Sequence, residues 1–510
     1  MSDSIELTAK EKEQVRTHGL NEDQVKAQIK TFKDGIETVK VEKAATPDDG
    51  IVQLDDIERS VLHDAFIIED DVELAKFIPA SGAASRMFKA LYQFKVDLDK
   101  SNQSPSQLLE ADDHVALQAF FDRFEDFAFA EQALSMARKS HPDLEKLSKD
   151  ERYKILLDTV LNEGKLGMAE LPKGLIPFHR YADKTLTPFE EHFHEASYYA
   201  SYQNKAHLHF TVTDDHLARF KQVEEACLPL LKQETELDYF VHYTFQERST
   251  DTIAVNPDNS IFKFENGELL FRPAGHGALI KNLNKIDADL IFIKNIDNVQ
   301  RKETAKENAG YKRALAGKLL EVQRKTYHYL NVLSAGLYQD HEEEIRTFIR
   351  ETLHIKGDVK DKSTAYELLN RPIRICGMVK NEGAPGGGPF WVELGNGFTT
   401  LQIVETSQMD LSDEGQRSIL EHSTHFNPVD IVCGVKDFEG RKFDLEQYVN
   451  PKRGIITEKS AEGKPLKALE LPGLWNGAME HWNTIFVEVP LETFSPVKTV
   501  LDLLNQAHQG

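Results

Sequence analysis

The chain has 510 residues, 40% of them apolar and 28% charged, and its formal net charge is −23. This length supports two or more hydrophobic cores, and the composition is that of a globular protein. No apolar run approaches the roughly 18 residues of a membrane span, and the first residues lack the features of a secretory signal. The negative charge disfavours nucleic acid and anionic membranes as partners, and an anionic small substrate would need a local cluster of cations or a metal ion.

The three cysteines, Cys227, Cys376 and Cys433, are widely separated and form no Cys-x-x-Cys pair. Such a set predicts neither a disulfide framework nor a structural zinc site. Free thiols are usual in a reducing compartment, so we expect a cytoplasmic protein.

The first part of the chain predicts an arm followed by the start of an α/β core. Residues 1–73 are expected to form a helical N-terminal arm, because their Lys- and Glu-rich beginning has weak helical periodicity. The apolar run 74–79 then leads into the small residues 80–87. A strand, a tight turn and a helix in this order present backbone N–H groups to a phosphate.

A helical insertion and a series of alternating elements follow. Phe, Leu and Ala recur at helical spacing through residues 92–170, which predicts the insertion. Strands are then expected at 207–212, 238–245 and 289–294, with a helix at 214–235. This alternation predicts a parallel, doubly wound sheet, in which ligands bind beyond the carboxyl ends of the strands.

The remaining sequence is expected to complete the core. Its first part spans residues 74–299, residues 300–365 form a second helical segment, and residues 366–510 supply the second part. A glycine-rich loop at 383–389 lies in that second part.

The turn after the first core strand suits an anion. Ser81, Gly82 and Ala83 can bring backbone N–H groups close to a phosphate, and Arg86 adds a fixed positive charge. The alternative is an ordinary tight connection between a strand and a helix.

Two lysines also lie in contexts that suit phosphate. Lys173 follows a proline and precedes a glycine, whereas Lys498 follows an apolar strand and precedes an amphipathic helix. Alone, Lys173 also fits a solvated loop, and Lys498 also fits the end of a helix.

A glycine-flanked histidine and a lone aspartate complete the candidate residues. His276 lies between Gly275 and Gly277, which would let a ligand approach closely, although a plain turn is an alternative. Asp297 follows a buried strand and can be a Mg²⁺ ligand or a helix N-cap.

Several other histidines invite a zinc interpretation, which we consider less favoured than packing or surface roles. His192 and His194 are two residues apart and do not share a helical face. His207 and His209 would share a strand face, but no third ligand is evident near them. His179 also has no evident partner ligands in the sequence.

Taken together and in order, these segments resemble the UDP-sugar pyrophosphorylases of the sugar-1-phosphate nucleotidyltransferase superfamily. The resemblance covers roughly 74–91, 171–299 and 370–504 and implies a Rossmann-like, doubly wound mixed sheet with helical insertions. The whole chain also resembles a bacterial family described as a domain of unknown function. The matching motifs lie at 80–86, 172–176, 244–246, 273–277, 291–298 and 490–504.

The resemblance implies a Mg²⁺-dependent reaction of an NTP, with UTP expected first, and a sugar-1-phosphate to give a nucleotide sugar and pyrophosphate. It assigns a role to each candidate residue. Arg86, Lys173 and Lys498 are catalytic cations; Ser81, Gly82, Ala83, Gln246, Gly275 and His276 bind the nucleotide; Gly387, Glu405 and Asn427 bind the sugar; and Asp297 binds Mg²⁺.

The chain also departs from that family. Ser81 and Ala84 replace glycines of the phosphate loop, and each Cβ is expected to reduce backbone access. The insertion at 92–170 separates Arg86 from Lys173. Two alternatives therefore stay open: a glycosyltransferase-like enzyme that uses a nucleotide sugar, and a non-catalytic nucleotide or sugar-phosphate sensor. Lys498 favours the pyrophosphorylase, whereas Ser81 and Ala84 favour the sensor. The base, the sugar and the oligomeric state stay open.

Overall fold

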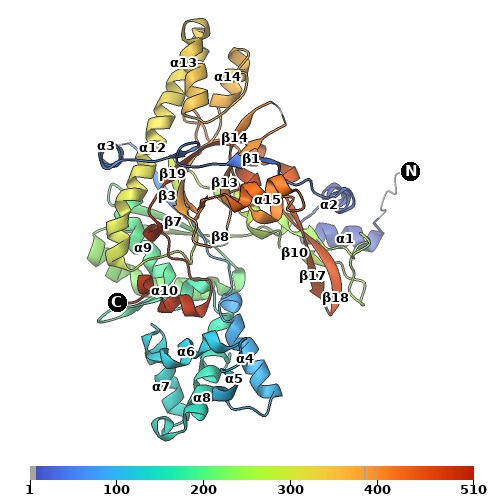
Figure 1. Ribbon diagram of the computed structural model, residues 1–510, viewed down its shortest axis with the longest axis vertical. Helices are drawn as coiled ribbons and strands as arrows, with labels where there is room; N and C mark the ends of the chain where they lie inside the picture. Colours follow the sequence, from blue (N-terminus) through green and yellow to red (C-terminus); the bar gives the residue numbers. More distant parts are fainter. Residues whose placement is uncertain (1–6, 70, 384–385, 396) are drawn as a thin grey trace. The chain divides into compact units, whose positions relative to one another are not determined.

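The computed structural model describes residues 7–69, 71–383, 386–395 and 397–510 (Figure 1). Part of the predicted glycine-rich loop and the first six residues of the predicted arm lie outside these ranges. The chain divides into two compact units whose segments alternate along the sequence. The first comprises Met1–Ala75, Thr244–Ile293 and Tyr311–Leu491, and the second comprises Lys76–Tyr243, Lys294–Gly310 and Glu492–Gly510.

The main sheet has ten strands and combines parallel with antiparallel pairs, which confirms the predicted α/β class with a mixed sheet. In the first unit the order is β2-β19-β12-β16-β11. β19 runs parallel to β12 with Ile375 opposite Ile485, and β16 runs antiparallel to β12. All residues of β12 and β19 except the last are buried, as expected for strands that are covered on both faces.

Helices of the first unit begin at clear sequence signals. Thr8, Asn21 and Asp55 each cap a helix by accepting a hydrogen bond from the backbone N–H three residues later. The helices of this unit are α1 (Ala9–His18), α2 (Glu22–Asp34), α3 (Asp56–Ile67), α11 (Ile280–Leu283), α12 (Lys302–Ser334, shared with the second unit), α13 (Tyr338–Glu351), α14 (Lys362–Leu369) and α15 (Glu414–Glu421). Its strands are β1 (Val41–Ala44), β2 (Ile51–Val52), β9 (Thr252–Ile253), β10 (Phe271–Arg272), β11 (Leu290–Lys294), β12 (Ile373–Lys380), β13 (Gly388–Glu393), β14 (Thr399–Val404), β15 (His425–Phe426), β16 (Asp430–Gly434), β17 (Ile455–Ala461), β18 (Lys464–Glu470) and β19 (Asn483–Glu488).

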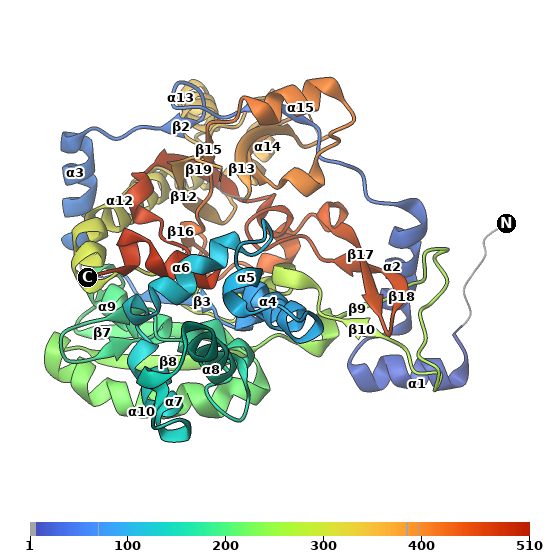
Figure 2. The same ribbon diagram turned by 60° about the horizontal axis from the view of Figure 1, so that its bottom comes forward.

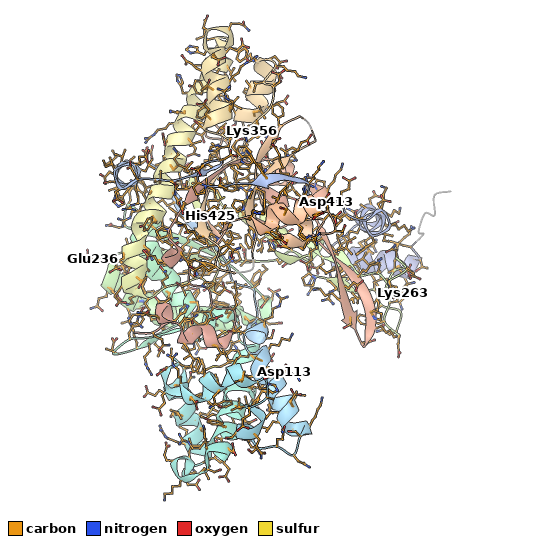
Figure 3. The ribbon with its side chains drawn as sticks, in the orientation of Figure 1. Asp113, Glu236, Lys263, Lys356, Asp413 and His425 are labelled. Carbon is orange, nitrogen blue, oxygen red and sulfur yellow. The ribbon has the colours of Figure 1, made fainter. Side chains whose placement is uncertain are left out.

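The N-terminal helices α1 and α2 lie beside β9, β10 and the β17–β18 hairpin (Figure 2). Val15 and Val25 of the helices share a small apolar cluster with Ile253 of β9. Lys263, labelled in Figure 3, forms an ion pair with Glu11 of α1. The first two helices therefore pack against segments that come much later in the sequence.

The second unit contains the predicted strand–helix–strand series. Its sheet order is β3-β7-β6, and β8 pairs with β7. The strands predicted at 207–212 and 238–245 and the helix predicted at 214–235 correspond to β7, β8 and α10 of this unit and are confirmed. The strand predicted at 289–294 is also confirmed and corresponds to β11 of the first unit. The elements of this unit are β3 (Leu74–Pro79), α4 (Lys89–Lys100), α5 (Pro105–Leu108), α6 (Gln118–Asp122), α7 (Ala130–Ser140), α8 (Lys149–Leu161), β4 (His179–Arg180), β5 (Thr185–Leu186), α9 (Pro188–Tyr199), β6 (Ser201–Tyr202), β7 (Lys205–Val212), α10 (Asp214–Thr235) and β8 (Asp238–Phe245).

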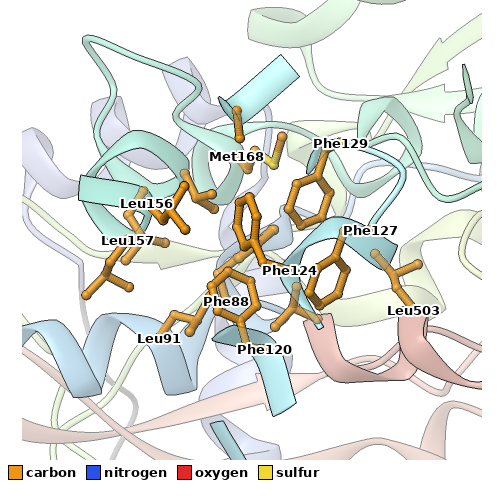
Figure 4. Packing of buried hydrophobic residues seen from close by; sticks show 14 of the residues in the cluster. Phe88, Leu91, Phe120, Phe124, Phe127, Phe129, Leu156, Leu157, Met168 and Leu503 are labelled. Carbon is orange, nitrogen blue, oxygen red and sulfur yellow. The ribbon is translucent and has the colours of Figure 1, made fainter. Parts of the chain in front are cut away.

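Helices α4 to α8 enclose a core that is rich in phenylalanine (Figure 4). Phe120, Phe124 and Phe127 pack edge to face or tilted, with ring centroids 5.2–6.3 Å apart. Leu503, from the last segment of the chain, belongs to the same core, as does Ala84 of the turn after β3. The inserted helices thus share one core with the segments that carry Arg86 and Lys498.

Within the described residues, no helix is both long and apolar enough to cross a lipid bilayer.

Replacing Phe127 by alanine should test this core. Phe127 is fully buried, so Phe127→Ala leaves a cavity and should lower the free energy of unfolding by about 3–5 kcal/mol. Urea unfolding followed by circular dichroism measures the change. Val115, exposed on the same insertion, provides the control, because Val115→Ala should change stability by less than about 0.5 kcal/mol. Equal effects of the two changes would contradict the packing.

Candidate functional site

Two lysines from distant parts of the sequence converge on one carboxylate in the second unit. Lys173 Nζ donates a hydrogen bond to Asp297 Oδ2 at 2.8 Å, and Lys498 Nζ approaches the same oxygen at 3.4 Å. Lys173 also donates to the Val497 carbonyl oxygen at 2.8 Å. The Lys173 side chain is 13% exposed and that of Lys498 is 53% exposed, so Lys173 is fixed whereas Lys498 can reach solvent.

Asp297 stays charged because of these two cations. Burial alone would raise the pKa of its carboxyl, but the charges of Lys173 and Lys498 outweigh burial and hold that pKa below its usual value. The cluster has two positive charges and one negative charge. It is therefore complementary to an added anion such as a phosphate.

Backbone contacts hold together the segments that carry Lys173, Asp297 and Lys498. The Val497 N–H donates to the Asp297 carbonyl oxygen at 3.1 Å, and the Ser495 N–H donates to Asn298 Oδ1 at 3.0 Å. Gly174 lies against Ile296, where an added Cβ would be 2.9 Å from Ile296 Cγ1. A larger residue after Lys173 would therefore push against the Ile296 side chain, and glycine suits this close contact.

The turn after β3 leaves backbone donors free. Lys173 N–H donates to the Gly82 carbonyl oxygen at 3.1 Å, which joins the turn to the Lys173 segment. Within the described part of the chain, the N–H groups of Ser81, Gly82 and Ala83 have no hydrogen-bond partner. Arg86 is exposed and, in the same part, forms no hydrogen bond or ion pair. These groups can bind an anion without breaking an existing contact.

Ala84 differs from the sequence-based expectation. Its methyl group is fully buried in the phenylalanine core and does not face the exposed side of the turn. The Ala84 N–H is also engaged, because it donates to the Leu171 carbonyl oxygen at 3.0 Å. The replacement of glycine at this position therefore does not obstruct the free donors of the turn.

A buried charge cluster that the sequence did not predict is formed by Lys76 within β3, Lys294 at the end of β11 and Glu195 of α9. Lys76 and Lys294 each donate to one oxygen of Glu195, at 2.7 and 2.6 Å, and none of the three side chains is more than 3% exposed. Burial opposes the Glu195 charge, yet the two lysines hold the pKa of Glu195 well below its usual value. The formal excess of one positive charge favours anions nearby. The presence of Lys76 and Lys294 inside otherwise apolar strands was the sequence signal that could have revealed this cluster.

Asp297 offers one free oxygen to a metal ion. Both lysines contact Oδ2, and within the described residues Oδ1 has no hydrogen-bond partner. In that part of the chain, no three His, Cys, Asp or Glu side chains gather closely enough to hold a metal ion. The donor set fits Mg²⁺ only with phosphate oxygens and water as its other ligands, which is a common arrangement for this ion.

A second cluster forms around His276 in the first unit. The His276 ring stacks on Trp475, with centroids 4.3 Å apart and planes 14° apart. The Leu474 N–H donates to His276 Nδ1 at 2.9 Å, which leaves the proton on Nε2. That Nε2 lies 3.5 Å from Glu405 Oε1, and Asn476 Nδ2 donates to the same oxygen at 2.9 Å.

This cluster depends on two loops that fit closely. A Cβ at Gly277 would overlap the Pro472 carbonyl oxygen, and one at Gly473 would overlap the His276 ring. Gly275 has a positive φ of 75°. Trp475 and Asn476 were not predicted, although the neighbouring Pro472, Gly473 and Gly477 marked a tight turn.

The other first-unit residues that were predicted to bind the sugar or the nucleotide differ in how far their polar groups are already bonded. Gly387 lies near Glu405, and its carbonyl oxygen accepts from the Asn427 N–H at 2.8 Å. The Asn427 side chain is committed to the backbone of Gly377 and Val429, so a direct sugar contact stays a prediction. Gln246 Nε2 is buried, and within the described residues no group accepts its hydrogen bonds.

The remaining histidines form packed or stacked groups. His179, His192 and His194 are buried. The rings of His207 and His209 each stack on that of His242, with centroids 5.9 and 4.4 Å apart.

Comparisons with known proteins give one family and several distant structures. The model of the family described as "Domain of unknown function (DUF4301)" matches residues 8–509. No curated protein matches the chain. The open and closed structures of UDP-glucose pyrophosphorylase from Leishmania major share 13% identity with it, covering 96% of this chain and 77% of that one, with a TM-score of 0.43. A UDP-glucose phosphorylase from Trypanosoma brucei shares 14% identity, covering 66% and 65%, with a TM-score of 0.36.

Gly277→Ala should disturb the His276 cluster. The added methyl group meets a backbone carbonyl oxygen, which cannot move without shifting the Trp475 loop. Overpacking of this kind costs about 1–3 kcal/mol, so we expect a lower Tm and a changed near-ultraviolet circular dichroism signal from tryptophan. Gly310→Ala is the matched control, because its Cβ has open space in α12 and should keep both signals. An unchanged tryptophan signal in Gly277→Ala would contradict the loop contact.

Proposed function

The chain belongs to the family described as Domain of unknown function (DUF4301), and we propose that it is a nucleotidyltransferase that makes a nucleotide sugar and pyrophosphate from an NTP and a sugar-1-phosphate. One observation carries the proposal: Lys173 and Lys498 share one oxygen of Asp297 in a cluster with excess positive charge. The order of the motifs that resemble the UDP-sugar pyrophosphorylases gives further support.

The proposed reaction requires charge neutralisation and alignment more than proton transfer. A phosphate oxygen of the sugar-1-phosphate forms a bond to the α-phosphorus of the NTP. The bond from that phosphorus to the bridging oxygen breaks, and pyrophosphate leaves with the electron pair. The nucleophile is already an anion, so preorganised cations and correct positioning supply most of the catalysis.

The cationic residues of the second unit would neutralise the phosphates in different ways, according to how firmly each side chain is held. Lys173 is held by two acceptors and would keep a fixed charge beside the phosphates. Lys498 has a longer contact with Asp297 and a half-exposed side chain, so it can turn to a phosphate oxygen. Arg86 and the free N–H groups of Gly82 and Ala83 would bind the remaining phosphate oxygens.

We propose Mg²⁺ as the cofactor, with Asp297 Oδ1 as the protein ligand. The ion would neutralise charge on the phosphates. Asp297 therefore has two tasks in the proposal, because Oδ2 orients the lysines while Oδ1 stays available.

The first unit offers groups that suit the uncharged parts of such substrates. The His276–Trp475 stack provides flat aromatic surface next to two hydrogen-bonding groups, Glu405 and Asn476. We propose nucleotide binding by Gly275 and His276 with Gln246, and sugar binding by Glu405 with Gly387 and Asn427. UTP is the first NTP to test.

The sensor alternative has less support than the sequence suggested. Its argument was the replacement of two glycines by Ser81 and Ala84, and of these the Ala84 methyl group faces the core instead of the turn, so only Ser81 still favours the sensor. The glycosyltransferase-like alternative does not account for the pairing of Lys498 with Asp297.

An assay of pyrophosphate release tests the proposal directly. The protein is incubated with Mg²⁺, each NTP in turn and a panel of sugar-1-phosphates, and release is expected with at least one pair. Nucleotide binding without release from any pair would support the sensor instead.

Lys498→Ala should lower kcat about 100- to 1,000-fold and leave the fold intact, because it removes one charge that acts on the transition state. Lys146, an exposed lysine on the inserted helices, supplies the control, and Lys146→Ala should keep full turnover. Normal turnover by Lys498→Ala would refute the role of that lysine.

Asp297→Asn should lower turnover and raise the Mg²⁺ concentration needed for half-maximal activity, because a neutral amide binds Mg²⁺ poorly. A magnesium titration of the rate measures both effects. An unchanged titration curve would show that the metal assignment is wrong.

A further inference from the structure

An arginine lies fully buried in β12, and the proposed reaction does not use it. Arg374 is 0% exposed, and its strand neighbours Ile373, Ile375 and Cys376 are buried as well. Within the described residues, Arg374 forms no ion pair with a carboxylate. A buried charge is costly unless its hydrogen bonds are satisfied, so the bonds of this side chain show what holds it there.

The Arg374 guanidinium binds neutral acceptors in place of a carboxylate. Its Nε donates to Thr484 Oγ1 at 2.8 Å, and its Nη1 donates to the Trp475 carbonyl oxygen at 2.6 Å. Thr484 belongs to β19, whereas Trp475 belongs to the loop between β18 and β19. A guanidinium holds its donors in fixed directions in one plane and can therefore join these two elements, whereas a lysine ammonium is a compact point charge.

The peptide unit between Trp475 and Asn476 is fixed at both of its polar groups. In the described part of the chain, Arg374 is the only donor to the Trp475 carbonyl oxygen. The Asn476 N–H, which belongs to the same peptide unit, donates to the Gly473 carbonyl oxygen at 3.1 Å. Because a peptide unit is planar, these two bonds together set its orientation.

That peptide unit joins two parts of the His276 cluster. On one side of it, the Trp475 ring stacks on His276 with centroids 4.3 Å apart. On the other side, Asn476 Nδ2 donates to Glu405 Oε1 at 2.9 Å. A rotation of the peptide would move both contacts at once. The bond from Arg374 therefore controls how the aromatic stack and the carboxylate are placed relative to each other.

A second buried side chain, Gln402, extends this anchor. Its Oε1 lies 3.5 Å from Arg374 Nη2, and its Nε2 donates to the Glu480 carbonyl oxygen at 2.8 Å. Trp475 and Glu480 lie on either side of the short helix Gly477–Met479. The two buried side chains therefore hold this segment at both of its ends.

We propose that Arg374 is a positioning residue, which orients the peptide unit between Trp475 and Asn476 so that the stacked rings and Glu405 are already arranged to receive the base or the sugar of the substrate. A site that is arranged before binding avoids the cost of ordering its side chains when the ligand arrives. The part that concerns the ligand rests on the proposed function, whereas the orientation of the loop does not.

Fluorine NMR of protein that contains 5-fluorotryptophan tests the orientation of the loop without a ligand. The sequence has three tryptophans, and Trp475→Phe assigns the signal of Trp475. Arg374→Lys keeps a cation but loses the planar fork, so the Trp475 signal should move or split. The signal of Trp391 should stay in place, because this ring lies in β13 against Lys356.

Two control variants separate this effect from a general loss of stability. Arg350→Lys makes the same chemical change at an exposed arginine of α13. Ile375→Val trims a fully buried side chain next to Arg374 in the same strand and should lower the midpoint of urea unfolding. Both variants should keep the wild-type signal of Trp475.

UDP-glucose is the probe for the ligand, because it carries both a base and a sugar. Isothermal titration calorimetry should show that Arg374→Lys raises its Kd about tenfold, as expected when about one charge-assisted hydrogen bond that arranges the site is lost. The Kd should stay at the wild-type value in Arg350→Lys and Ile375→Val. A moved Trp475 signal with an unchanged Kd would refute the link between the loop and the ligand.

An unchanged Trp475 signal in folded Arg374→Lys would overturn the proposal. If that variant does not fold, Thr484→Val decides, because it keeps the shape of the side chain and removes the acceptor of Arg374 Nε. The Trp475 signal should then move, and an unchanged signal refutes the positioning role. If the wild type does not bind UDP-glucose while the signal moves in the variant, the assigned ligand is wrong and the positioning role stands.

Discussion

A carboxylate that is withdrawn from water needs cations nearby, and the second unit is arranged around that requirement at Asp297. Lys173 and Lys498 satisfy it from segments that are more than half the chain apart. Removing Lys173 would leave Asp297 with only the longer contact to the half-exposed Lys498, and a buried charge without a close partner is strongly destabilising. The fold thus brings the segments together for an electrostatic reason, and the same arrangement leaves an excess of positive charge for an anion.

The inserted helices explain how such distant segments keep their positions. Their phenylalanine core also contains Ala84 beside Arg86, Ile176 near Lys173, and Val497 and Val500 on either side of Lys498. Close-packed interiors resist displacement, so the backbone that carries each cation is held by apolar neighbours. The insertion therefore supports the cationic segments by sharing one hydrophobic core with them.

Local patterns in the sequence predicted several elements of the fold and some residues of the candidate site. Strands β7 and β8 were located by their apolar residues and their burial alternates along the chain, and α10 was located as the helix between them. A lysine between a proline and a glycine pointed to Lys173, and an aspartate after a buried strand pointed to Asp297. The features that the sequence did not predict depend on contacts between residues that are distant in the chain. The turn around Trp475 has a local signal, but its stacking does not, because its partner His276 is distant in sequence. The burial of Ala84 depends on helices that follow it.

The interleaving of the two units has a consequence for synthesis. Residues 492–510 belong to the second unit, yet the ribosome makes all of the first unit before them. At about 5–20 residues per second, the interval between Lys173 and Lys498 is of the order of tens of seconds. During that time Asp297 has one lysine instead of two, and the phenylalanine core lacks Leu503. Until residues 492–510 are made, the second unit lacks one of its cations at Asp297 and part of its phenylalanine core, so its packing cannot be complete.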